Sequence, residues 1–254
     1  MPELDTYLEA EDVTVRFGGL TAVDQVTIGA DRGEIVGVIG PNGAGKTTLF
    51  GAIAGTVRTE QGRVRLGDHD VTGWSSHRRA RAGLARTFQR LEVFGSMTVR
   101  ENLAYATEAR ALGSSPLRLL SRNRHRRLDV VDDLLEQLGL AAMADERAAD
   151  LPPGTARVLE LGRALCADPE LLLLDEPSSG LDVNETMALA DHVVDAVRTR
   201  GVGVVLIEHD MSMVLTICER LYVLDFGQCI AAGPTAEVAA LPVVRDAYLG
   251  TGHG

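Results

Sequence analysis

Hydrophobic and polar residues alternate along the N-terminal part of the chain. Residues 8–17 and 22–28 both alternate, and residues 62–67 form a shorter polar–apolar run. A period of two residues is typical of strands that are buried on one face. These segments predict a small antiparallel sheet, and a helix is expected after it at residues 76–83.

Three later segments are apolar at every position, which predicts strands that are buried on both faces. They are residues 35–39, 171–174 and 203–207. Helices are expected between and after them at residues 49–54, 183–199, 211–218 and 236–248, and further strands at 221–224 and 228–231. Apolar strands that alternate with helices indicate a parallel sheet covered on both faces.

The middle of the chain, from residue 90 to residue 167, has a helical pattern. Three helices are expected there, at residues 98–111, 128–138 and 155–167. The first is preceded by a start signal, because Thr98 and Glu101 have the spacing of a capping box. This segment therefore predicts a separate group of helices inserted into the α/β pattern.

The loop after the strand at 35–39 carries a phosphate-binding pattern. It runs Gly40-Pro41-Asn42-Gly43-Ala44-Gly45-Lys46-Thr47-Thr48. Between a strand and a helix, G-x-x-x-x-G-K-[ST] indicates a nucleotide-binding loop. Its glycines let backbone N–H groups surround phosphates, and the helix N-terminus favours negative charge. Lys46 is expected to reach the β- and γ-phosphates, and Thr47 to place its hydroxyl on Mg²⁺.

Charged residues follow the two other apolar strands. Asp175 and Glu176 end the run at 171–174, and His209 follows the run at 203–207. Ligands of open α/β sheets gather at the carboxyl ends of the strands. We expect Asp175 to hold Mg²⁺ through water and Glu176 to polarise an attacking water. His209 would contact the γ-phosphate and orient that water, although a histidine at a strand end is by itself more often structural.

These patterns predict an α/β fold, namely a P-loop NTPase core with a mostly parallel sheet, an antiparallel β subdomain and an inserted helical subdomain. Residues 1–89 would form the first part of the ATP-binding core together with the β subdomain. Residues 90–167 would form the helical subdomain, and residues 168–254 the second part of the core.

Composition and charge narrow the class of protein. A net charge of −11 over 254 residues argues against a nucleic-acid partner. Three cysteines without a C-x-x-C pair indicate a reducing compartment. No apolar run approaches the ~20 residues that span a bilayer, and the first residues lack signal-peptide features, so we expect a cytoplasmic protein. The basic stretch 118–127 is either a solvated surface or a contact for anionic head groups or an acidic partner.

Further motifs make the chain resemble ABC-type ATPases, the nucleotide-binding subunits of ABC transporters, over nearly its whole length. They are Arg86-Thr87-Phe88-Gln89, Leu151-Pro152-Pro153-Gly154-Thr155 and Ser179-Gly180-Leu181-Asp182. The resemblance implies that Phe17 stacks on adenine. It implies that Gln89 contacts Mg²⁺ and the attacking water and reports the nucleotide state to a membrane subunit. It also implies that Gly154, Thr155 and Asp182 act across an interface between two ATPase subunits. The alternatives are a core position for Phe17 and a solvated loop amide for Gln89.

A narrower resemblance is to the ATPase subunits of branched-chain amino-acid importers. It rests on residues 17–23, 86–89, 97–103, 207–211 and 247–250. It implies a pair of ATPases on the inner face of the membrane, integral membrane subunits, and an extracytoplasmic solute-binding protein that acts indirectly. Relatives of this kind also handle amides, urea and other small solutes. The alternative class is a soluble regulatory ABC ATPase.

The signature motif departs from the family pattern at two positions. Pro153 has no N–H to donate to a phosphate, although proline is tolerated in the first turn of a helix. Thr155 stands where glutamine is expected, but its hydroxyl can still donate. Losing one charge-assisted hydrogen bond costs roughly 1.5–3 kcal/mol, which is about ten- to a hundredfold in rate. We therefore expect a slow but competent ATPase, or a weakly active half-site paired with a different ATPase chain.

Overall fold

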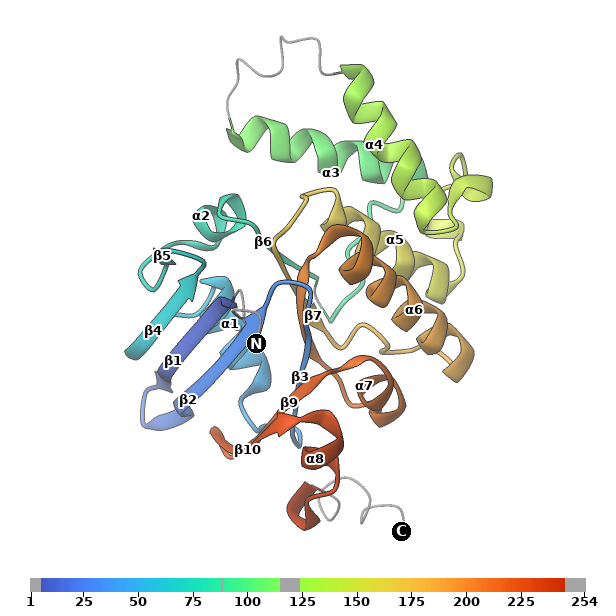
Figure 1. Cartoon of the computed structure of the whole chain (residues 1–254). Helices are drawn as coiled ribbons and strands as arrows, with labels where there is room; N and C mark the ends of the chain where they lie inside the picture. Colours follow the sequence, from blue (N-terminus) through green and yellow to red (C-terminus); the bar gives the residue numbers. More distant parts are fainter. Residues whose placement is uncertain (1–5, 88, 115–123, 245–254) are drawn as a thin grey trace.

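The structure, a computed structural model, describes residues 6–87, 89–114 and 124–244. The strands of these residues form two sheets (Figure 1). The smaller sheet is antiparallel and has the order β2-β1-β4-β5, which confirms the predicted antiparallel sheet. Its strands are β1 Thr6–Phe17, β2 Leu20–Asp31, β4 Gln61–Leu66 and β5 His69–Asp70.

The larger sheet has the order β10-β9-β3-β8-β7-β6 within the described residues. Its strands are β3 Ile35–Ile39, β6 Leu84–Arg86, β7 Leu171–Asp175, β8 Gly203–Ile207, β9 Arg220–Asp225 and β10 Gln228–Pro234. Neighbouring strands are parallel except β10 and β9. Ile207 of β8 pairs with Asp175 of β7 on one side and Val38 of β3 on the other. The carboxyl ends of these three strands therefore meet at one edge of the sheet.

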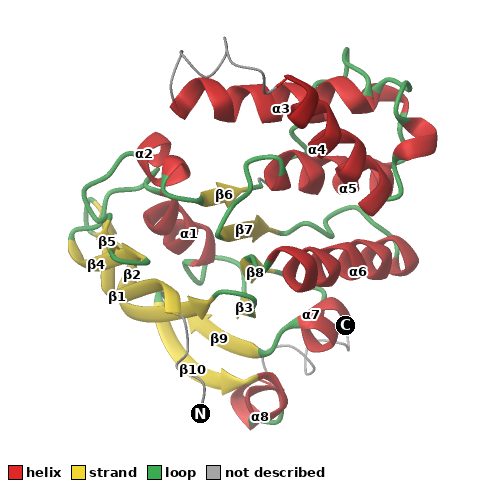
Figure 2. Ribbon diagram, turned by 45° about the horizontal axis from the view of Figure 1, so that its top comes forward, coloured by secondary structure: helices red, strands yellow, loops and turns green. Residues whose placement is uncertain are grey.

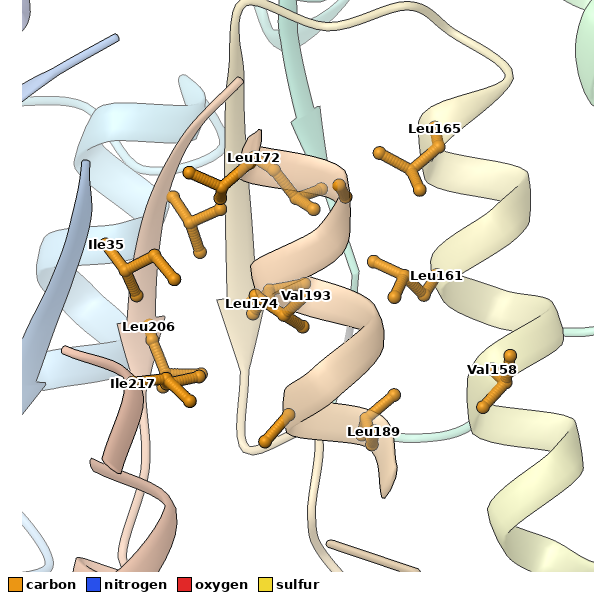
Figure 3. Packing of buried hydrophobic residues seen from close by; sticks show 14 of the residues in the cluster. Ile35, Val158, Leu161, Leu165, Leu172, Leu174, Leu189, Val193, Leu206 and Ile217 are labelled. Carbon is orange, nitrogen blue, oxygen red and sulfur yellow. The ribbon is translucent and has the colours of Figure 1, made fainter. Parts of the chain in front are cut away.

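Helices cover both faces of the larger sheet (Figure 2). They include α1 Lys46–Ala54, α2 Ser76–Arg81, α5 Pro153–Leu165, α6 Val183–Arg200, α7 Met211–Ile217 and α8 Thr235–Ala239. Leu171 and Leu173 of β7 are buried in a cluster with α1 and the smaller sheet. Leu172 and Leu174 point to the opposite face and pack against α5 and α6 (Figure 3). Burial on both faces explains why this strand is apolar throughout.

A group of helices lies above the sheet, at the top of Figure 1. It contains α3 Val99–Ser114 and α4 Arg124–Gln137, and α5 joins it to the sheet. The predicted capping box is confirmed, because the Thr98 N–H donates to Glu101 Oε2 at 2.8 Å and the Glu101 N–H donates to Thr98 Oγ1 at 3.1 Å. Leu103 and Leu134 share a hydrophobic cluster with Leu172 of the sheet. The boundaries after residues 89 and 167 stay predictions.

Several elements differ from expectation. The helix expected from residue 49 begins at Lys46, because the phosphate loop leads directly into it. The helix expected over 236–248 ends at Ala239, followed by a separate helical turn at residues 242–244. The short strand β6 was missed, because three residues carry too little periodicity to be recognised. Among the described residues, none of the helices combines the length and the apolar character that a membrane span requires.

Candidate nucleotide site

The phosphate loop joins β3 to α1 and is shaped by two glycines at its ends. Gly40 has a φ of 154°, and a Cβ there would lie 2.1 Å from the carbonyl oxygen of Leu224. Gly45, the N-cap of α1, has a φ of 99°, and its Cβ would lie 2.4 Å from the carbonyl oxygen of Ala22. Any side chain at these positions would displace the neighbouring backbone. The loop therefore follows a path that only glycine permits.

Lys46 lies at the base of the loop and is almost fully buried. Its Nζ donates to the carbonyl oxygens of Gly40 at 2.6 Å and Pro41 at 2.9 Å. Burial lowers the pKa of Lys46, while the nearby carboxylates of Glu176 and Asp175 act in the opposite direction. The ammonium is thus held at the inner side of the loop, close to the two acidic residues that were predicted to share its site.

A pocket of about 480 Å³ opens above the loop. It is lined by Phe17, Leu20, Thr21, Ala22, Asn42, Gly43, Ala44, Gly45, Lys46, Thr47, Thr48, Glu176, Phe226 and Gly227. Phe17 is 54% exposed, so it is a wall of this pocket and not a core residue of β1. Thr47 is exposed and Thr48 half-buried, next to one another at the start of α1.

Three of the predicted site residues converge beside this pocket. Glu176 Oε1 lies 2.7 Å from His209 Nε2, and Gln89 Nε2 donates to Glu176 Oε2 at 2.8 Å. The backbone N–H of Glu176 donates to the carbonyl of Ile207 at 2.9 Å, and its φ is 50°, in the left-handed region. This strained turn at the end of β7 aims the carboxylate at the end of β8. Segments from three parts of the chain therefore hold one carboxylate between an imidazole and an amide.

Asp175 lies deeper than Glu176. It is buried, and its Oδ2 forms an ion pair with the guanidinium of Arg86 at 2.8 Å. Arg86 ends β6 and pairs with Leu173 of β7, two residues before Asp175, so the guanidinium and the carboxylate come from adjacent strands. The described residues contain no group of three or more His, Cys, Asp or Glu that would hold a metal by themselves. A hydroxyl with one carboxylate and substrate phosphates suits Mg²⁺, which keeps several waters. The exposed Thr47 hydroxyl fits that kind of ligand set.

The signature segment lies away from this pocket. Pro152 is the N-cap of α5 and Pro153 is its first residue, so proline occupies a first turn whose N–H groups have no partner within the helix. The Gly154 N–H donates to Glu185 Oε1 at 3.3 Å, and Glu185 Oε2 accepts from the N–H of Asp182 in the capping box of α6. Of the predicted nucleotide-binding residues that the structure describes, Gly154, Thr155 and Asp182 are thus not brought to the phosphate loop.

A family model described as ABC transporter matches residues 23–179, from β2 to the loop after β7. This match covers more than half of the chain. The chain belongs to the ABC transporter ATP-binding proteins. The matched residues of this ABC ATPase include β3, the phosphate loop and β7 with Asp175 and Glu176.

Several relatives match this ABC ATPase along almost its whole length. The high-affinity branched-chain amino acid transport ATP-binding proteins LivG of Salmonella typhimurium and BraF of Pseudomonas aeruginosa are 38% and 36% identical, with 96% of this chain and 97% of theirs covered. The lipopolysaccharide export system ATP-binding protein LptB of Acidithiobacillus ferridurans is 35% identical over 97% of this chain and 98% of its own.

Among solved structures, the ADP conformation of an ATP-binding cassette of an ABC transporter has a TM-score of 0.85. It is 31% identical, with 96% of this chain and 99% of that chain covered. This likeness confirms the predicted α/β fold of a P-loop NTPase.

Two charged residues of this ABC ATPase, the half-buried Arg86 and the buried Glu208, were not predicted as part of the site. The sequence places Arg86 only in the Arg86–Gln89 motif, and the structure pairs its guanidinium with Asp175. Glu208 is 2% exposed and accepts from the N–H groups of Ser178 at 2.7 Å and His209 at 2.8 Å. It therefore fixes the loop after β7 to the turn that carries His209. The sequence signal that could have indicated Glu208 is its position as a charged residue directly after the apolar strand β8.

Proposed function

We propose that this chain hydrolyses ATP to energise the import of branched-chain amino acids or a related small solute. The observation that carries the enzymatic part is the convergence of Glu176, His209 and Gln89 beside a phosphate loop. The solute is proposed from the LivG and BraF relatives. The LptB relative has nearly the same identity, so the cargo depends on the membrane subunits with which the chain assembles.

In the proposed reaction the triphosphate of ATP lies in the loop from Gly40 to Thr48, and the adenine ring lies toward Phe17. Glu176 accepts a hydrogen bond from the attacking water and takes up its proton as the bond from the water oxygen to the γ-phosphorus forms. The bond between the γ-phosphorus and the β–γ bridging oxygen breaks on the opposite side, and ADP leaves with that oxygen. His209 keeps the Glu176 carboxylate in place and contacts the γ-phosphate. Lys46, held 2.6 Å from the Gly40 carbonyl, exchanges this partner for phosphate oxygens and neutralises developing charge.

Mg²⁺ would be held by Thr47 and Gln89 with Asp175 behind them, and when bound it neutralises phosphate charge and orients the triphosphate. Thr47 is exposed at the start of α1 and lines the pocket. Gln89 is exposed and already contacts Glu176. Asp175 already pairs with Arg86, so its carboxylate would bind Mg²⁺ through water and not directly.

A second chain completes the site in this proposal. Gly154, Thr155 and Asp182 lie outside the pocket of their own chain, and the N–H groups of Gly154 and Asp182 both donate to the carboxylate of Glu185. Two chains in a head-to-tail pair would each place these residues over the other's ATP. The proposed partners are therefore a second ATPase subunit, either itself or a similar chain, integral membrane subunits, and indirectly a solute-binding protein. The chain would lie on the inner face of the cell membrane.

The test is the rate of ATP hydrolysis by the purified chain over a range of protein concentrations, with Lys46→Ala as the inactive comparison. A pair of chains gives a rate that rises faster than linearly and is lost in the variant. Co-purification with an integral membrane protein then separates a transporter subunit from a soluble regulatory ATPase. A linear rate that Lys46→Ala leaves intact would contradict the proposed site.

Restoring the signature motif is expected to raise the rate. In Pro153→Gly with Thr155→Gln, a backbone N–H and a longer side-chain donor become available to the partner's γ-phosphate. One recovered charge-assisted hydrogen bond is worth roughly 1.5–3 kcal/mol, so kcat should increase about ten- to a hundredfold. Steady-state turnover measures this, with thermal unfolding to verify that α5 is kept. An unchanged kcat in a folded variant would mean that the two residues do not limit turnover.

A further inference from the structure

A second aromatic residue reaches the nucleotide pocket from a part of the chain that no motif marked. Phe226 forms the turn between β9 and β10 and lines the pocket together with Phe17 and Leu20. It is 89% exposed, so burial in the core does not account for a large apolar side chain at this position. It was not among the predicted nucleotide-binding residues, because the sequence around it predicts only a turn between two strands.

The turn that carries Phe226 is fastened to the phosphate loop. The Gly227 N–H donates to the carbonyl oxygen of Ala44 at 3.0 Å, and the Gly227 carbonyl accepts from the N–H of Asp24 at 2.8 Å. A Cβ on Gly227 would lie 2.9 Å from the carbonyl oxygen of Ala22. The turn, the loop and the start of β2 therefore form one backbone unit, and the side chain of Phe226 projects from a fixed point beside the loop.

Turn geometry also fails to explain the phenylalanine. The loop between Asp225 and Gln228 has two residues, with φ values of 43° at Phe226 and 81° at Gly227. Positive φ at both positions is the pattern of a type I′ turn, which strongly favours Asn, Asp or Gly at the first position. A side chain with a Cβ and a bulky ring is conformationally unfavourable there. The residue is thus costly for the backbone and contributes nothing to the core.

We propose that Phe226 is a base-binding residue, and that it forms a second aromatic wall for the purine of the bound nucleotide. This rests on the proposed ATPase function. Phe17 approaches the pocket from the turn between β1 and β2, and Phe226 from the turn between β9 and β10. An aromatic ring binds a base through its face, which is tolerant of the base's hydrogen-bonding pattern. Phe226 would therefore contribute to binding of the base, whereas the phosphate loop binds the phosphates.

The substitution Phe226→Asn separates the proposed contact with the base from the part that this position plays in the turn. Asparagine removes the ring but suits the left-handed backbone, so the variant should unfold at a higher temperature than the wild type. Loss of one stacking partner should weaken ATP binding about tenfold. Binding of inorganic tripolyphosphate, which has no base, should stay within about twofold of the wild type. Phe226→Trp keeps an aromatic face and should keep the affinity for ATP.

Calorimetric titration without Mg²⁺ measures both ligands while preventing turnover, and Leu215→Ala serves as the control. Leu215 is a half-exposed apolar residue on α7, outside the residues that line the pocket. Wild-type affinity for ATP in a folded Phe226→Asn would overturn the proposal. Equal weakening of ATP and tripolyphosphate would also overturn it, since the turn would then act through the phosphate loop. Failure of the wild type itself to bind ATP would instead refute the proposed function.

Discussion

Replacing Glu176 with glutamine is expected to lower ATP turnover about 10²- to 10⁴-fold, the range that a general base contributes. Glutamine has the same shape and can retain hydrogen bonds to the side chains of His209 and Gln89, which lie 2.7 and 2.8 Å from the carboxylate oxygens. It lacks the basicity to take a proton from water. The substitution therefore removes the chemistry and leaves the pocket and its phosphate loop in place.

Two measurements on this variant distinguish its proposed role from a structural one. ATP affinity should stay close to the wild type, while kcat falls, because the interaction is made to the attacking water and not to the phosphates. Glu237→Gln is the matched control, since Glu237 is exposed on α8. If Glu176→Gln hydrolysed ATP at the wild-type rate, another group would be the base.

His209 allows a second test of the same unit. Since its Nε2 contacts the carboxylate of Glu176, the two residues should act together, and the loss in the double variant His209→Ala with Glu176→Gln should be far smaller than the product of the two single losses. If the loss in the double variant equalled the product of the two single losses, His209 would act independently of Glu176. Single-turnover rates of the four proteins give the comparison directly.

The parts of this site that were predictable from the sequence are those in which a local segment determines the geometry. The phosphate loop is one continuous stretch between a strand and a helix, and its glycines and Lys46 lie where the pattern places them. Asp175 and Glu176 follow an apolar strand, and the parallel register brings that strand end beside Ile207 and hence close to His209. Strand ends in a parallel sheet are thus predictable neighbours.

The remaining parts depend on contacts between distant segments, which periodicity does not reveal. The partnership of Arg86 and Asp175 requires the pairing of β6 with β7, and β6 has only three residues. The place of Phe226 requires the β9–β10 turn to bond with Ala44. The predictions for the basic stretch 118–127 and for residues 247–250 fall mainly or wholly outside the described residues. The roles assigned to Gly154, Thr155 and Asp182 stay predictions, because they concern a second chain.

Arg79 is the largest fully buried side chain of the described residues, and the sequence offered no reason to expect this. Its guanidinium donates to four carbonyl oxygens, those of Ala52, Ile53, Trp74 and Thr72, at 2.6, 2.6, 3.3 and 3.0 Å. The first two belong to the last turn of α1, where helix carbonyls lack partners and the dipole favours a cation. Burial lowers the pKa of Arg79 to about 10, so it keeps its charge at neutral pH.

The position of Arg79 links the stability of α1 to the phosphate loop. Gly55 ends α1 with a φ of 75°, and a Cβ there would lie 2.8 Å from Arg79 Nε. The chain therefore closes tightly around the guanidinium at one end of the helix, while Lys46 and Thr47 begin the other end. A change at Arg79 should loosen the helix that presents both residues to the nucleotide.

Arg79→Ala should accordingly destabilise the protein by about 3–5 kcal/mol, because it leaves buried carbonyl oxygens without donors and opens a cavity. Urea unfolding gives the free energy. Arg78→Ala is the matched control, because Arg78 is exposed and its Cζ lies 3.6 Å from the centroid of the Trp74 ring. Such a cation–π contact is worth about 0.5–1 kcal/mol. Arg79→Lys should recover only part of the loss, because an ammonium lacks the planar fork that reaches carbonyls on both segments. Equal losses for Arg78→Ala and Arg79→Ala would show that these hydrogen bonds do not hold α1 in place.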